Sequence, residues 1–439
     1  MAPTVAVAHY PEGAGHATRM LAIAEAIENA GGTVRMAGGG AGTEFVALNG
    51  YDEFEPTTVD YIDTYQDGSL WRAASRSVPA SLRRIADYRA WLSATDPDAL
   101  VTDDMFAALA ASRCDVPLYV LKHDMPGLYD DVLERTGARF HTLFQLSTAR
   151  EFFYPVVWPE SGADPARATR IPPVALDGEP PVREEYDVVV VPSHYSSLSR
   201  IATHLRRQGY DVLDVSDESW DPVESLLPYV RGADAVVCSG YSTVMDAAVA
   251  GTPCVVHPAT DEQDAVADWL ERFDVAGFAV APDPIDVLDA VADPPDPPAF
   301  ENGAAVIARR VLTDLRDPDP YAAADPEGFG RTDGDAPRAD RSALATAATV
   351  PTLAAACLVA TGSLLSPARA GRSVAEAGRS AASAAGRFGG AARTAVARAG
   401  RVGAGATRTV GSALSSAGDG CLRALRRCRR AASRARRPF

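Results

Sequence analysis

The chain has 439 residues, of which 47% are hydrophobic, and a formal net charge of −16. Because single hydrophobic cores rarely grow past about 250 to 300 residues, this length predicts two domains and an extension. The six cysteines show no C-x-x-C spacing, which argues against a zinc site or a disulfide framework and fits a reducing cytoplasm.

Charge is divided unevenly along the chain. Residues 1–340 hold 25 Arg and Lys against 56 Asp and Glu, a net charge of −31, whereas residues 341–439 hold 17 Arg against only Glu376 and Asp419, a net charge of +15. Lys122 is the only lysine in the chain. An acidic, lysine-poor body predicts a protein kept soluble in concentrated salt, and our hypothesis is a halophilic, haloarchaeal origin.

The N-terminal segment predicts a buried strand, a glycine-rich turn and a helix. The strand covers Thr4–Tyr10, the turn Gly13–Arg19, and the helix Met20–Asn29. A glycine turn that opens a helix can bind an anion, although such turns also use glycine for geometry alone. No basic region precedes the strand, so we expect no signal peptide and a cytoplasmic protein.

Two further strands of the first half end in polar residues. The strand over residues 99–104 ends in Asp103 and Asp104, and the strand over 117–124 ends near His123. The two aspartates could equally be a helix N-cap and a solvated neighbour. We expect a last strand over residues 137–147, and a proline-rich crossover between domains after it.

The second half is organised around residues 234–264. We predict a strand ending at Cys238, a turn, a helix to Ala250 stopped by Gly251, and a strand over Cys254–His257. The helix N-terminus beside Gly240 could seat a diphosphate, and carboxylates and an amide near the strand ends suit sugar or ribose hydroxyls. The candidate donor-binding residues of this stretch are Ser239, Gly240, Tyr241, Ser242, Thr243, Asp246, Glu262 and Gln263. The alternative is an ordinary strand–helix–strand unit with a Ser or Thr cap.

The order of glycine turn, small helix, carboxylate, G-x-P, apolar strand and E-Q resembles a known family. It is similar to the donor-sugar half of nucleotide-sugar glycosyltransferases of the bacterial lipid II N-acetylglucosaminyltransferase and monogalactosyldiacylglycerol synthase type. The resemblance implies an α/β fold of the GT-B class, with two Rossmann-like domains facing each other across a cleft. We expect the acceptor-side domain at 1–155, the crossover at 156–184, the nucleotide-sugar domain at 185–318, a linker at 319–340 and an Ala/Arg-rich extension at 341–439.

The same resemblance suggests roles for residues of the first domain. Its first turn is similar to G-x-G-H-x-x-R, which implies that Gly13, Gly15, His16 and Arg19 lie on the acceptor side, with His123 nearby. His16 could accept a proton from an attacking hydroxyl, with Asp103 or Asp104 as rival bases, or could simply bond its own turn.

The chain departs from the family in three places. Ser193 and His194, with Ser196 and Ser197, stand where the family has glycines for the diphosphate. Asp246 replaces the usual Glu, and Val266 replaces a common Asn. Serine and imidazole donors could serve the same anion, whereas the last change suggests an altered sugar contact.

The implied reaction moves a sugar from a nucleotide-diphosphate donor, with a UDP-sugar expected, to a hydroxyl or phosphate of a lipid-linked or other acceptor, with inversion. No metal or other cofactor is expected. A UDP-N-acetylglucosamine 2-epimerase on the same fold, or a non-catalytic nucleotide-sugar-binding subunit, remain alternatives.

The extension combines a weakly apolar segment, residues 343–365, with an arginine-rich tail. Because a single span would place the arginines on the outer side, we favour a surface-lying or re-entrant segment on the anionic inner face of the cell membrane. The alternatives are a disordered tail, nucleic-acid contact, or docking on the acidic body of the chain.

Overall fold

The computed structural model describes most of the chain up to Asp317. It covers residues 2–59, 70–123, 142–162, 164, 167–178, 185–193, 196 and 198–317, without the side chains of 70–78, 261 and 262. The predictions for His194, Ser197 and residues 319–439 therefore lie outside the described residues. Met1–Asp60 and Arg76–Gly334 form one compact unit, and both sheets belong to it.

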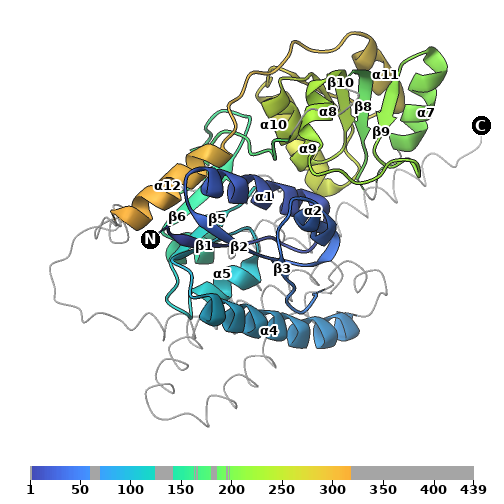
Figure 1. The fold of residues 1–439 in the computed structure, drawn as a ribbon. Coiled ribbons are helices and arrows are strands. Elements are labelled where there is room, and N and C mark those ends of the chain that lie inside the picture. Colours follow the sequence, from blue (N-terminus) through green and yellow to red (C-terminus); the bar gives the residue numbers. More distant parts are fainter. Residues whose placement is uncertain are drawn as a thin grey trace, which may run out of the picture. The chain divides into compact units, whose positions relative to one another are not determined.

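The first lobe is built on a seven-stranded parallel sheet in the order β3-β2-β1-β4-β5-β6-β7 (Figure 1). Apolar residues of β1 and β4 are almost completely buried, as expected for strands covered on both faces. The strands are β1 Thr4–Ala8, β2 Thr33–Ala37, β3 Glu53–Phe54, β4 Ala99–Thr102, β5 Leu118–Leu121, β6 Glu151–Pro155 and β7 Thr169–Ile171.

Helices cover both faces of this sheet (Figure 1). One face packs against α1 and α12 in a single apolar core that includes Met20, Ile27, Ile307 and Val311. The other face carries α4 and α5. The helices of this lobe are α1 Ala14–Asn29, η1 Gly40–Gly42, α2 Thr43–Leu48, α4 Leu70–Thr95, α5 Met105–Ala111, a segment over 142–148, and α12 Ala304–Arg316.

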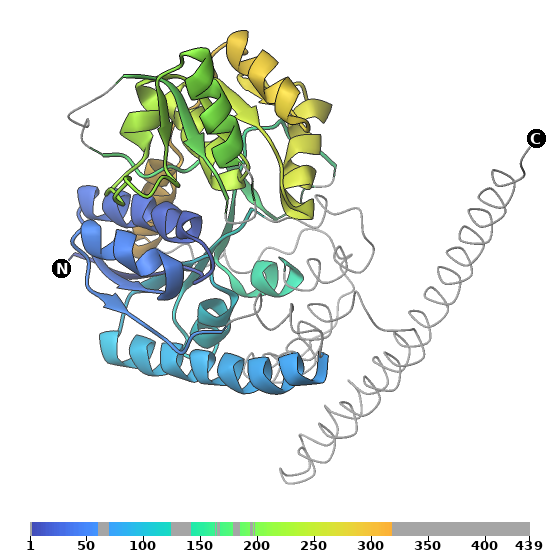
Figure 2. The same cartoon turned by 90° about the vertical axis from the view of Figure 1, so that its right-hand side faces the viewer.

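The second lobe is a five-stranded parallel sheet in the order β12-β11-β10-β8-β9 (Figure 2). Helices α7 and α11 pack on one face in an apolar core, and α8 and α9 contact the other. Its elements are β8 Tyr186–Val191, α7 Leu198–Gln208, β9 Val212–Asp214, α8 Leu227–Arg231, β10 Ala233–Cys238, α9 Tyr241–Ala250, β11 Cys254–Val256, α10 Asp261–Arg272, β12 Phe278–Val280 and α11 Pro284–Ala292.

The predicted α/β class is confirmed, because each lobe is a parallel sheet with the strand order of a Rossmann-like domain. The stop at Gly251 is also observed, because this residue caps α9 in the left-handed conformation with φ 77°. Helix α12 follows the second lobe in the chain and returns to pack on α1.

Two boundary predictions differ from the structure. Residues 142–148 are helical, where a strand over 137–147 was expected, and the apolar pattern of a short segment does not separate the two. Strand β7 lies inside the range predicted as a crossover, so the first sheet extends into it.

Asp104 belongs to a buried network and not to an open site. Its Oδ2 accepts hydrogen bonds from Arg84 Nε at 3.0 Å and from Tyr88 Oη at 2.8 Å, and its Oδ1 caps α5 by accepting from the N–H of Phe106. Arg84 and Asp104 are both 0% exposed. The hypothesis that Asp104 is a base is therefore corrected: its carboxylate holds α4 against the end of β4.

Removing this carboxylate is expected to destabilise the protein strongly. Asp104→Ala leaves the Arg84 guanidinium buried without its counter-charge, so we expect a loss of about 3 to 5 kcal/mol in the free energy of unfolding. The control is Asp217→Ala, whose ion pair with Arg206 is solvent-exposed and should contribute about 0 to 1 kcal/mol. Urea denaturation of both variants tests the difference, and equal small losses would contradict it.

Candidate functional site

Polar side chains gather where the order of each sheet reverses. In the first sheet β1 is followed by β2 on one side and by β4 on the other, so the carboxyl ends of β1 and β4 form a crevice of the kind that binds ligands. In the second sheet the equivalent point lies between β8 and β10. Asp103 follows β4, whereas Ser193 follows β8 and Ser239 follows β10.

His16 and Asp103, which the sequence offered as rival bases, form one hydrogen-bonded pair. His16 Nδ1 lies 2.7 Å from Asp103 Oδ2. Asp103 Oδ1 accepts a hydrogen bond of 2.8 Å from the N–H of Tyr10. The Asp103 side chain is only 4% exposed, whereas His16 is 25% exposed. The imidazole therefore has solvent access while its partner does not.

The charge of Asp103 fixes the proton on this imidazole. Burial alone would raise the pKa of Asp103, but the charge and hydrogen bond of His16, the charge of Arg19 and the N–H of Tyr10 lower it to about 2. Asp103 is thus ionised at neutral pH and can only accept, so a neutral His16 carries its proton on Nδ1. Nε2 is left with a lone pair, which is the state that a general base requires.

A second buried pair joins the residue after β1 to the first residue of β3. His9 Nε2 lies 2.5 Å from Glu53 Oε1, which also accepts from the N–H of Gly39. Burial opposes ionisation of both groups, yet their mutual hydrogen bond and charges raise the pKa of His9 and lower that of Glu53. The sequence reasoning missed this pair. Its signal was a histidine directly after β1 and a glutamate at the start of β3, two strands that lie on either side of β2.

The turns after β8 and β10, which were predicted to bind the donor, combine serine hydroxyls with the N-terminus of α9. Ser239 is 1% exposed, and its Oγ accepts a 2.9 Å hydrogen bond from the N–H of Ser193. Ser193 Oγ is a buried atom without a hydrogen-bond partner in the described part of the chain. Helix α9 then begins at Tyr241 after Gly240. A hydroxyl and the N-terminus of a ten-residue helix can both donate to an anion.

Direct contacts join the two turns. Arg19 donates a 3.0 Å hydrogen bond from Nη1 to Ser242 Oγ, and the ring of His123 stacks on Tyr241 with centroids 4.4 Å apart. His123 also lies 5.8 Å from the His16 ring. Tyr241 donates its hydroxyl to the carbonyl of Pro155. The first-lobe dyad and the start of α9 therefore lie within one group of touching side chains.

Gly15 is required by this contact. A Cβ at this position would come within 2.1 Å of Ser242 Oγ and 2.8 Å of Ser242 Cβ. Any side chain would push α1 and α9 apart. Gly13 has φ 81° at the start of α1, a conformation that favours glycine.

Asp246 is a half-buried carboxyl on α9. The structure gives it no hydrogen-bond or salt-bridge partner among the described residues. Burial raises its pKa to about 7, and the positive charge of Arg19 opposes the shift. A carboxyl of this kind is available to accept from a ligand hydroxyl, as the sequence analysis predicted for a ribose.

The other predicted donor residues have local roles. The Gln263 side chain accepts from the N–H of Ala259 at 2.8 Å, and its backbone N–H donates to the hydroxyl of Thr260, the N-cap of α10. Thr243 is buried in the first turn of α9. The Glu262 side chain lies outside the described residues, so its predicted sugar contact stays a prediction.

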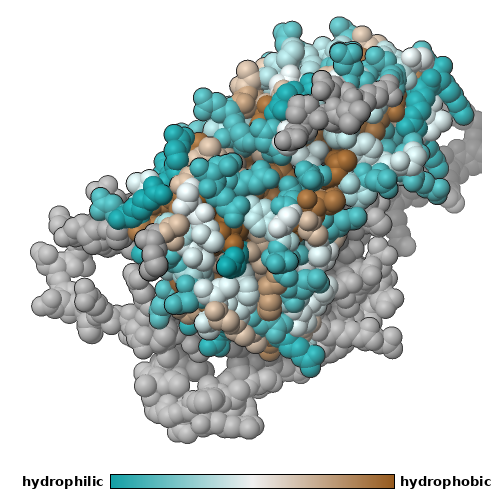
Figure 3. Space-filling view, viewed as in Figure 1, coloured by the Kyte–Doolittle hydropathy of each residue, from teal (hydrophilic) through white to brown (hydrophobic). Residues whose placement is uncertain are grey.

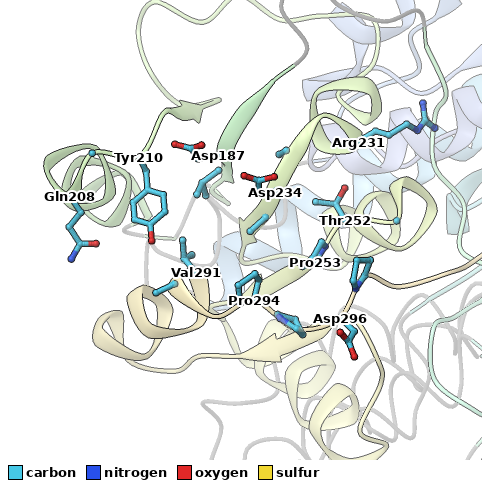
Figure 4. A pocket seen from close by; sticks show the side chains of 18 residues that line it. Asp187, Gln208, Tyr210, Arg231, Asp234, Thr252, Pro253, Val291, Pro294 and Asp296 are labelled. Atoms are coloured by element: carbon cyan, nitrogen blue, oxygen red, sulfur yellow. The ribbon is translucent and has the colours of Figure 1, made fainter.

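A separate hollow lies at the amino ends of the second sheet (Figure 4). Asp187, Asp234 and Asp296 line it together with Arg231, at the edge opposite the donor turn. Hydrophilic side chains predominate on the face shown in Figure 3.

Two features are absent from the described residues. No group of three or more His, Cys, Asp or Glu side chains there is arranged to hold a metal ion. In the same part of the chain, every helix is too short or too polar to cross a bilayer.

The chain matches no protein-family model, and no curated protein matches its sequence. Solved structures of similar fold include the spinosyn forosaminyltransferase SpnP, at 15% identity and a TM-score of 0.48, covering 73% of this chain and 96% of that one. Others are the Streptomyces sp. SF2575 glycosyltransferase SsfS6 (15%, 0.48, 72% and 96%) and the spinosyn rhamnosyltransferase SpnG (17%, 0.47, 73% and 98%).

The raised pKa of Asp246 predicts an unusual dependence of stability on pH. The folded state holds a proton that the unfolded chain loses above its ordinary pKa of 3.8, so this group makes the fold less stable as pH rises toward about 7. Asp246→Asn should therefore be more stable than wild type at pH 8, by about 1 to 2 kcal/mol after allowing for solvent screening, and little changed at pH 4.

Thermal and urea unfolding at both pH values measure the effect. Asp268→Asn, which removes an exposed carboxylate on α10, is the control and should change stability by less than about 0.5 kcal/mol. An Asp246→Asn protein that is equally or less stable at pH 8 would contradict the assignment.

Proposed function

We propose that this chain is a glycosyltransferase that moves a sugar from a nucleoside-diphosphate donor, with a UDP-sugar expected, to an acceptor hydroxyl with inversion at the anomeric carbon. One observation carries the proposal: the His16–Asp103 pair lies in contact, through Arg19, with the start of α9. A base and an anion-binding turn side by side are what an acid–base displacement with a diphosphate leaving group requires.

His16 would act as the general base. Its Nε2 takes the proton of the acceptor hydroxyl as the acceptor oxygen forms a bond to the anomeric carbon. Asp103 keeps the imidazole in the Nδ1–H form and stabilises the imidazolium that results, in the manner of the aspartate of a Ser-His-Asp triad.

The donor half would hold the leaving group. As the bond from the anomeric carbon to the β-phosphate oxygen breaks, its electron pair leaves with the nucleoside diphosphate. The hydroxyls of Ser193 and Ser242 and the N–H groups at the start of α9 are suited to that charge. Asp246 would accept from a ribose hydroxyl, and Glu262 with Gln263 would contact the sugar.

The acceptor is proposed from the sequence of the extension. Arginines in residues 341–439 are suited to an anionic membrane surface, which favours a lipid-linked acceptor presented there. A glycan hydroxyl or a phosphate is the other acceptor of this proposal.

Ligand-induced stabilisation of the full-length protein tests the donor. In concentrated KCl, a nucleotide at about a hundred times its dissociation constant should add roughly 2.7 kcal/mol of stability. We expect a shift that is selective for UDP or one UDP-sugar within a panel that includes TDP, ADP and GDP. Absence of a shift with every nucleotide would remove the proposal, and conversion of UDP-N-acetylglucosamine without an acceptor would replace it with epimerisation.

Substitution of His16 tests the base. His16→Ala should lower kcat for transfer by about 10²- to 10⁴-fold, since general-base catalysis contributes this much, while the dissociation constant for UDP changes little. His204→Ala, an exposed histidine on α7, is the matched control and should retain wild-type kcat. Transfer by His16→Ala at near the wild-type rate would exclude this base.

A further inference from the structure

Arg19 is a nearly buried cation with weak partners. Its side chain is 4% exposed. Nη1 donates to a neutral oxygen, Ser242 Oγ, and Nη2 reaches Asp103 Oδ2 only at 3.5 Å. The contact of Nη2 with His16 Nδ1, at 3.1 Å, is not a hydrogen bond when Nδ1 carries the proton. The carboxylate of Asp103 is already taken by His16 and the N–H of Tyr10.

Arg84, the other buried arginine among the described residues, is fully paired. Arg84 donates to Asp104 at 2.7 and 3.0 Å, to the carbonyl of Gly38 at 2.8 Å and to that of Thr57 at 3.2 Å. A buried charge is costly unless it is paired and hydrogen-bonded. Arg84 therefore serves the fold alone, whereas Arg19 retains capacity to bind an anion.

The position of the Arg19 guanidinium indicates which anion it would bind. Arg19 comes from α1 of the first lobe, yet its fork lies at Ser242 in the first turn of α9 and 5.4 Å from the Tyr241 ring centroid. The positive charge of Arg19 also lowers the pKa of Asp246, against the effect of burial. An anion at the start of α9 would thus meet the helix N-terminus from one lobe and a guanidinium from the other.

We propose that Arg19 binds the β-phosphate of the donor, in place of the acceptor-side role expected from the sequence. The inference rests on the proposed function and assigns this contact within it. On binding, Arg19 exchanges the neutral hydroxyl of Ser242 for a phosphate oxygen, which gives a stronger, charge-assisted bond with fork geometry. The same contact strengthens as negative charge grows on the departing diphosphate.

This role predicts selective loss of the β-phosphate contribution to binding. Isothermal titration calorimetry at one fixed KCl concentration compares UDP with UMP, which lacks the β-phosphate. Arg19→Met should weaken UDP binding at least tenfold, about 1.4 kcal/mol, and UMP binding less than threefold. Arg19→Lys keeps the charge but not the fork and should fall between. Arg35→Met, an exposed arginine of the same lobe, should match wild type.

The outcomes separate this inference from the proposed function. If wild type binds UDP more tightly than UMP and Arg19→Met preserves that ratio, Arg19 does not contact the β-phosphate, and the donor site stands without it. An equal loss for UDP and UMP, seen in Arg19→Lys as well, would show that Arg19 only holds α1 against α9 and would overturn the inference. Failure of wild type to bind any nucleoside phosphate would remove both claims.

Discussion

The carboxylate of Asp103 is the group on which the site depends. It is almost completely buried at the end of β4, and its two oxygens bind the backbone of Tyr10 and the imidazole of His16. Burial would favour the neutral acid, so its pKa of about 2 requires the cationic and N–H partners that converge on it. One charge thereby joins the ends of β1 and β4, orients His16 and selects its tautomer.

The contact between the lobes is set by sterics as much as by charge. Only a glycine at position 15 lets Ser242 approach α1, and this approach brings the Arg19 guanidinium to the start of α9. Helix α12, which follows the second lobe in the chain, packs on α1, so the helix that carries His16 and Arg19 is fixed on the side of its core. A displacement of α1 would therefore disturb His16 and the turn before α9 together.

The two neighbouring aspartates show how environment separates identical side chains. One oxygen of Asp103 binds the imidazole of His16, through which it can influence a reaction. Asp104 instead pairs with the buried Arg84 and caps α5. Arg19 and Arg84 differ in the same way, since Arg84 has more partners than Arg19. In both cases the number of partners that the fold supplies decides between a structural and a chemical role.

Local sequence patterns were enough to predict many of the strands and helices and the ends of the strands where polar residues lie. Apolar runs and glycine turns are local features, so β1, α9 and the stop at Gly251 could be predicted from them. Which of these residues come into contact depends on the three-dimensional fold. His16 and Asp103 are 87 positions apart, and Arg19 and Ser242 are 223 apart. Pairing of that kind depends on the strand order and on the direction in which each side chain points. A local sequence pattern predicts neither.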